Sequence, residues 1–255
     1  MTVTFLGTGT SQGVPVIACS CSVCKSIDFK DKRLRSSVHI KSGNTSFIID
    51  VGPDFRQQVL RENIAHLDAV LLTHEHRDHT AGLDEVRSYN FKQKMDMPVY
   101  GRKEVLDQIQ AEFQYIFTDY KYPGVPRVEL NEISNEPFKV NNVDILPVEV
   151  MHYKLPVFGF KIGDFAYITD AKTISEKEKE KLKNIDVLVI NALQHDPHIS
   201  HLTFEEALEL IAELKPGKAY LTHISHNLGL SRDIEKMLPG NVFLAYDGLK
   251  LNLGA

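Results

Sequence analysis

Short runs of apolar residues alternate along the whole chain with longer segments that fit helices. Many of the short runs are apolar almost throughout, which is typical of strands buried on both faces. The predicted strands are Val3–Leu6, Val38–Lys41, Ser46–Asp50, Ala69–Leu72, Val143–Val150, Val157–Ile162, Phe165–Thr169, Val187–Ile190, Ala219–Leu221 and Val242–Tyr246. The predicted helices are Phe55–Glu62, Leu83–Phe91, Lys103–Phe117, Ser175–Lys183, Thr203–Leu214 and Arg232–Leu238. This mixture indicates a layered α/β fold.

The helix that begins at Thr203 has the clearest ends. Glu206 follows Thr203 by three residues, which is the pattern of a capping box, and Pro216-Gly217 closes the last turn. No internal repeat, low-complexity linker or composition change divides the chain. We therefore expect a single domain over residues 1–255.

Length, composition and charge limit the classes of protein to which the chain can belong. The chain has 255 residues, enough for one large domain with a sizeable core. Its net charge of −5 gives no overall basic footprint for nucleic acid. The first residues lack the positive charge of a signal peptide, and no apolar run approaches the ~18 residues of a membrane span. We expect a cytoplasmic protein with no membrane partner.

The segment from His74 to His79 concentrates side chains that bind metals. It reads H-x-H-x-D-H, with His76 and Asp78 between the two ends, and it follows the apolar run Ala69–Leu72. Imidazoles and carboxylates suit zinc and related first-row ions. Four such groups cannot all serve one tetrahedral ion, so the segment predicts a site for two. The competing interpretation is a polar loop with surface histidines.

Further candidate ligands follow other predicted strands. His152, Asp170 and His223 each come just after a strand, on loops that we expect at one edge of a sheet. A single residue of this kind is weak evidence, because turns often carry Asp or His. Three of them together with the histidine cluster are much stronger evidence for a metal centre.

The three cysteines lie close together, at Cys19, Cys21 and Cys24. Small buried thiols are the plain alternative, but clustered thiolates in a polar segment are a zinc signature. Such a site needs a fourth ligand from elsewhere in the chain.

Candidates for proton transfer and phosphate contact are less specific. His195, His198 and His201 precede the capped helix, and a histidine with its pKa near ~6.5 suits proton transfer. Each could equally be a surface or packing histidine. Arg35 and Arg56 match the geometry of an oxyanion, although a structural role is the more common one for such residues.

The histidine motif, together with Asp50 in Ile48-Ile49-Asp50-Val51-Gly52, resembles the metallo-β-lactamase-fold hydrolases, and the resemblance runs from Gly7 to Gly248. It implies a four-layer αββα sandwich, with two mixed sheets between helical layers and a two-metal site at one edge.

The resemblance also implies a role for each ligand. One ion would take His74, His76 and His152, and the other would take Asp78, His79 and His223. Asp170 would bridge them, Asp78 would also orient the nucleophile, and Asp50 would hold the histidine loop from behind. The ions would be zinc or manganese.

Within this superfamily the chain looks like one phosphodiesterase branch. The matching segments are Gly7–Pro15 with the cysteines, Arg35–Ser37, Gly52–Arg56, Thr222–His226 and Ala245–Gly248. In that branch, three cysteines and a histidine bind a structural zinc, which implies Cys19, Cys21, Cys24 and His226 here. His39 is a competing fourth ligand. His201 resembles a histidine that assists the phosphate or the leaving group.

The expected function is metal-dependent hydrolysis of a small phosphodiester, cyclic and phosphoribosyl- or nucleotide-like, by water activated between two ions. A tRNA 3′-processing endonuclease is the main competing function. The segment Tyr120–Arg127 is short for its tRNA-binding arm, and the acidic balance argues against a polyanion. A thioester or ester hydrolase of the glyoxalase II type and a silent binding domain also compete. The resemblance leaves a homodimer open.

Overall fold

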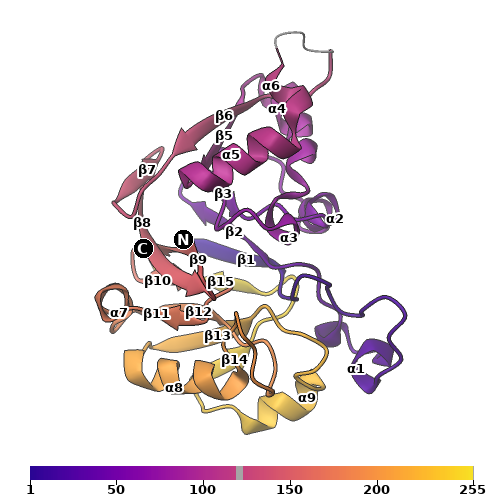
Figure 1. Cartoon of the computed structure of the whole chain (residues 1–255), viewed down its shortest axis with the longest axis vertical. Helices are drawn as coiled ribbons and strands as arrows, with labels where there is room; N and C mark the ends of the chain where they lie inside the picture. The colour runs from indigo at the N-terminus through magenta and orange to yellow at the C-terminus, as the bar shows by residue number, and fades with distance from the viewer. Residues whose placement is uncertain (119–122, 255) are drawn as a thin grey trace.

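Two mixed β-sheets lie face to face in the computed structural model, which describes residues 1–118 and 123–254 (Figure 1). The first sheet has the order β15 (Lys250–Asn252), β1 (Thr2–Gly7), β2 (Ser37–Ser42), β3 (Thr45–Ile49), β4 (Ala69–Leu71), β5 (Met97–Gly101) and β6 (Val128–Glu132). The second has the order β11 (Thr173–Ile174), β8 (Val143–His152), β9 (Leu155–Ile162), β10 (Phe165–Tyr167), β12 (Val187–Asn191), β13 (Lys218–Thr222) and β14 (Val242–Leu244). β7 (Phe138–Val140) pairs with β8.

Helices cover the outer face of each sheet. Those packed on the first sheet are α2 (Phe55–Arg61), η2 (Leu83–Val86), α4 (Arg87–Gln93), α5 (Lys103–Glu112) and α6 (Gln114–Phe117). Those packed on the second are α7 (Glu176–Leu182), α8 (Phe204–Leu214) and α9 (Ser231–Ile234), which continues into η3 (Glu235–Met237). Short helices α1 (Ser22–Lys25), η1 (Phe29–Asp31) and α3 (Arg77–Thr80) lie in connecting loops.

The strands are buried on both faces because side chains alternate between two cores. Phe47 and Ile49 of β3 enter the core between the sheets, whereas Ile48 enters the core under the first helical layer. Val189 and Leu188 of β12 divide in the same way between the central core and the core under α8. Three cores separate four layers, and the predicted αββα sandwich is confirmed.

All ten predicted strands are present, and the elements that the sequence missed are short or polar. β5 contains Pro98, β6 alternates polar and apolar residues, and β7, β11 and β15 have two or three residues each. Three predicted helices are divided. The 3-10 helix η2 precedes α4, a break at Phe113 separates α5 from α6, and α9 ends at Ile234, where the 3-10 helix η3 follows. The single domain stays a prediction.

The predicted capping box of α8 is confirmed. Thr203 Oγ1 accepts from the Glu206 amide at 3.1 Å, and a Glu206 carboxylate oxygen accepts from the Thr203 amide at 2.8 Å. We expect Thr203→Ala to lower the free energy of unfolding by about 1 kcal/mol and the Tm by ~3 °C. Thermal unfolding would check this, with Thr173→Ala on an exposed strand as the control. An unchanged Tm would contradict it.

None of the helices in the described residues is long and apolar enough to cross a bilayer. Residues 120–122 of the segment that is short for a tRNA-binding arm lie outside the described residues.

Candidate metal centres

The predicted ligands converge because each follows the end of a strand. Asp50 follows β3, the His74 loop follows β4, and Asp170 and His223 lie beyond the ends of β10 and β13. Asp50, Asp170 and His223 have left-handed backbones, with φ of 66°, 57° and 55°. Few residues other than glycine adopt this conformation, although Asp and His do so more often than most. The left-handed residue breaks each strand abruptly, which is a feature common at functional sites.

His74, His76 and His152 bring ring nitrogens together. His74 Nε2 lies 3.0 Å from His76 Nδ1, and ligand atoms of all three residues lie within 4.8 Å of one another. The Thr73 hydroxyl donates to a buried carboxylate, so it accepts from His74 Nδ1, at 2.9 Å. His152 donates from Nδ1 to the Ser200 carbonyl, also at 2.9 Å. His74 and His152 therefore each present an unprotonated Nε2, the form that binds a metal ion.

Three carboxylates surround His79. Its Nε2 lies 3.1 Å from Asp78 Oδ2 and 3.3 Å from Asp170 Oδ2, while Nδ1 donates to Asp50 at 2.7 Å. The ring is buried, and Nε2 has no hydrogen-bond partner among the described residues. His223 Nε2 lies 3.4 Å from the other oxygen of Asp170. An unpaired buried nitrogen together with neighbouring carboxylate oxygens makes a donor set of the kind that binds metal ions. The residues of this cluster therefore fit a metal ion.

Ser36 fixes the orientation of His223. The Ser36 hydroxyl donates to the Gly9 carbonyl at 2.9 Å, so it accepts from His223 Nδ1 at 3.1 Å. His223 Nε2 is thereby left unprotonated, and it lies 3.3 Å from Thr10 Oγ1. Ser36 and Thr10 belong to segments that resemble the phosphodiesterase branch, but the sequence pattern gives them no role. Only the folded chain shows that both contact the ring of His223.

Charge in this cluster favours a cation. Burial alone would raise the pKa of the Asp170 carboxyl, but the imidazoles of His223 and His79 hold it well below its usual range. Burial would likewise lower the pKa of His79, yet Asp78 and Asp170 raise it well above the usual value. Asp78 and Asp170 therefore stay ionised and create a negative field at this point, whereas burial raises the pKa of Asp50.

Of the three histidines before α8, His201 lies nearest the cluster. It is buried, and its Nδ1 lies 3.7 Å from Asp170 Oδ1 without a hydrogen-bond partner in the described part of the chain. His198 lies beside it, with ring centroids 5.0 Å apart and the two rings tilted by 37°. His195 instead forms a 2.7 Å contact with Glu205. The structure thus places His201 beside the candidate metal ligands.

The cysteines gather around His226. The distances from His226 Nδ1 to the sulfurs of Cys19, Cys21 and Cys24 are 3.3, 3.4 and 3.6 Å. The Cys24 amide and His226 lower the pKa of the Cys21 thiol to about 6, whereas burial raises that of Cys24 to about 11. These four donors fit a closed tetrahedral site. His39 does not join them, since it bonds to Ser46 at 2.8 Å, and that alternative is wrong.

Arg35 is occupied by neighbours within the chain. Its guanidinium lies 3.1 Å from Asp54 and donates to the Ser11 carbonyl. Arg56 lies exposed on α2. Neither the ion pair of Arg35 nor the exposed position of Arg56 is evidence that the arginine contacts phosphate.

Comparison with known proteins agrees with this geometry. The family model for the β-lactamase superfamily domain matches residues 45–224. A solved diphosphatase from the PhnP family is 37% identical, with a TM-score of 0.93, and the match covers 99% of this chain and 98% of that one. The chain belongs to the β-lactamase superfamily and, within it, to the PhnP family. The fold and the branch expected from the sequence are both confirmed.

Curated relatives of this PhnP-family chain are longer proteins. An octanoyltransferase of Porphyromonas gingivalis is 42% identical over 248 residues, which make up 96% of this chain and 50% of that protein. A ribonuclease Z of Staphylococcus epidermidis is 25% identical over 169 residues, 64% of this chain and 49% of that protein. The chain thus spans about half the length of the curated relatives that it matches.

Proposed function

We propose that this PhnP-family chain is a metal-dependent hydrolase that cleaves a small phosphodiester with the help of two divalent ions. The observation that carries the proposal is the convergence of two sets of donors on Asp170. His74, His76 and His152 form one set, with ligand atoms close together. The other set contains His79, which lies 3.1 Å from Asp78. Two such sites side by side suit displacement at phosphorus.

Each set of residues would hold one ion, and Asp170 would be shared. Asp78, His79 and His223 would hold the second ion, with either zinc or manganese at both positions. When bound, the two ions supply positive charge that activates water and neutralises phosphate oxygens.

The chain's own groups supply orientation and proton transfer. Asp78 is half-buried and reaches the cluster from the start of α3, where it can orient the attacking water. His201 lies 3.7 Å from the Asp170 carboxylate and has an unpaired ring nitrogen. Burial lowers the pKa of His201 to about 3, so the neutral ring would act on the leaving oxygen through its remaining N–H. Asp50 is buried behind His79 and holds that ring in place.

A substrate panel tests the proposal. Metal-loaded protein would be assayed with phosphoribosyl 1,2-cyclic phosphate, a 2′,3′-cyclic nucleotide and bis(p-nitrophenyl) phosphate, and the phosphomonoester product or nitrophenol would be measured. We expect turnover of at least one phosphodiester, and it should cease when a chelator removes the metal ions. If the fully metal-loaded protein turned over none of them, the proposal would fail.

Diphosphate hydrolysis is a second candidate, because the solved PhnP-family relative is described as a diphosphatase. Attack by water at phosphorus is common to both reactions, and only the leaving group differs. A nucleoside diphosphate derivative in the same panel would separate them. The panel would also include an octanoyl thioester and a precursor tRNA, because relatives of twice the length carry octanoyltransferase and ribonuclease Z names.

Asp50 offers a test of the positioning role. It accepts from the Thr73 amide and hydroxyl and from His79 Nδ1. Asparagine tolerates the left-handed backbone at this position, but its amide cannot accept all of these bonds. We expect Asp50→Asn to lower kcat/KM and metal affinity by about 10- to 100-fold. Asp54→Asn, on a carboxylate paired with Arg35, is the control. Unchanged metal affinity would argue against the role.

His201 offers a test of proton transfer. We expect His201→Gln to lower kcat by about 100-fold or more on a substrate with an alkoxide leaving group. The loss should be much smaller on bis(p-nitrophenyl) phosphate, because nitrophenolate leaves without a proton. Equal losses on both substrates would indicate that His201 acts only on structure.

We also propose that Cys19, Cys21, Cys24 and His226 bind a structural zinc. The Val16 and Cys24 amides donate to the sulfurs of Cys24 and Cys21, at 3.3 and 3.4 Å. Amide bonds of this kind stabilise thiolates. A closed site of four ligands stabilises structure and leaves no position for substrate.

A further inference from the structure

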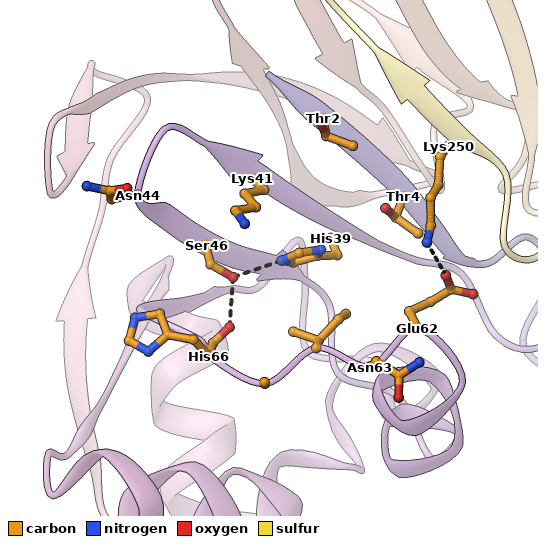
Figure 2. A pocket seen from close by; sticks show the side chains of 12 residues that line it. Thr2, Thr4, His39, Lys41, Asn44, Ser46, Glu62, Asn63, His66 and Lys250 are labelled. Atoms are coloured by element: carbon orange, nitrogen blue, oxygen red, sulfur yellow. Dashed lines mark hydrogen bonds and ion pairs between the residues drawn. The ribbon is translucent and has the colours of Figure 1, made fainter.

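A polar pocket lies on the first sheet, away from both candidate metal centres. It is about 460 Å³ in volume and lies between strands β1 and β2 and the loop that follows α2 (Figure 2). None of its lining residues belongs to either cluster of metal-capable groups in the described chain. Its volume is in the range of pockets that hold a small molecule.

The floor of the pocket carries hydrogen-bonding groups that have no partner. Thr4 is only 4% exposed, and its hydroxyl makes no hydrogen bond to other described residues. Ser46 donates its hydroxyl to the His66 carbonyl at 2.8 Å, so His39 donates from Nε2 to Ser46. Burial and Lys41 lower the pKa of His39 to about 4, so the ring is neutral and Nδ1 carries a lone pair. The hydroxyl of a buried threonine and the ring acceptor of a half-buried histidine favour a ligand that carries a hydroxyl group.

The rim of the pocket is positively charged. Lys41 is exposed and has no ion-pair partner among residues 1–118 and 123–254. Lys250 lies 3.1 Å from Glu62, and Arg61 contacts the same carboxylate at 2.8 Å. Glu62, the one acidic residue of the described lining, is therefore paired, although Arg61 also contacts Asp247 at 3.5 Å, and the surplus positive charge is that of Lys41. A pocket with surplus positive charge in a chain of net charge −5 indicates an anionic ligand.

From these groups we propose that the pocket binds a small phosphorylated molecule with a free hydroxyl group, of the sugar phosphate class. The phosphate would lie at the rim between Lys41 and Lys250, and a hydroxyl would reach Thr4 and His39 on the floor. The proposal is independent of the hydrolase activity, because it uses no residue assigned to the metal centres.

Amide NMR of the zinc-loaded protein, titrated with ribose 5-phosphate, tests this proposal by location. We expect saturable shifts at the amides of β1 and β2 around Thr4 and His39. Lys41→Glu should weaken this binding by about tenfold or more, because it replaces a charge-assisted contact with repulsion. Lys177→Glu, the same change on an exposed lysine of α7, should leave it unchanged.

Two further comparisons distinguish the contribution of the floor residues to binding from that of the rim residues. Thr4→Val keeps the shape of the side chain but removes its hydroxyl. It should weaken the binding of ribose 5-phosphate more than the binding of inorganic phosphate. Shifts confined to the strand ends near His74 would overturn the proposal, as would unchanged binding in Lys41→Glu. If inorganic phosphate bound as tightly as ribose 5-phosphate, the role given to the floor would be wrong.

Discussion

Replacing Asp170 by asparagine is expected to lower kcat/KM by about 1,000-fold or more, which is ~4 kcal/mol of transition-state stabilisation. Asp170 lies within 3.4 Å of both His79 and His223, and its two oxygens face different histidines. An amide can offer only one oxygen and no negative charge. Loss of the shared carboxylate should lower the affinity of the protein for both ions at once, and the mutant should bind at least one ion fewer per chain.

The substitution is designed to leave the fold intact. Asp170 has φ of 57°, a conformation that asparagine also tolerates, and the Asp170 side chain is buried. Steady-state kinetics and metal analysis would be measured together on the purified mutant. Asp186→Asn, the same change on an exposed residue before β12, is the control and should keep full activity. An Asp170→Asn protein with full metal content and more than a tenth of the activity would refute the bridging role.

The candidate metal ligands were predictable because strand ends are easy to recognise in the sequence. An apolar run that stops at a His or Asp places that side chain at the edge of the sheet, and His74, Asp170 and His223 all follow this rule. The groups that orient them were not predictable by the same logic. Ser36 and the Ser200 carbonyl reach His223 and His152 from distant segments, and no local pattern indicates such contacts.

The fold shows the same division between local and distant information. Strands buried on both faces, such as β3 and β12, stood out as continuous apolar runs. β6 and β15 lie at the edges of the first sheet, and their residues are largely exposed or half-buried. Their apolar signal is weak, because an edge strand depends on backbone pairing with its neighbour. His39 was wrong as a competing zinc ligand for a related reason, since only the packing of β2 against β3 reveals its contact with Ser46.

Replacing Cys24 by serine is expected to remove the proposed structural zinc and to lower the stability of the whole chain. Cys24 is buried in α1, and its sulfur lies 3.6 Å from His226, on the loop after β13. The proposed zinc therefore ties the N-terminal loop to the second sheet, across more than 200 residues of sequence. Serine binds zinc poorly, so we expect the loss of about 3 kcal/mol, or a fall in Tm of roughly 6–12 °C.

Metal analysis distinguishes this loss from damage to the active cluster. Wild-type protein should hold about three ions per chain, two in the active cluster and one at the cysteines. Cys24→Ser should hold about two, and Ser22→Ala, an exposed change in the same helix, should hold three. His226→Gln should reproduce the Cys24→Ser result, because it removes the fourth donor from the other side. Unchanged zinc content and Tm in both variants would mean that the thiols pack as ordinary core side chains.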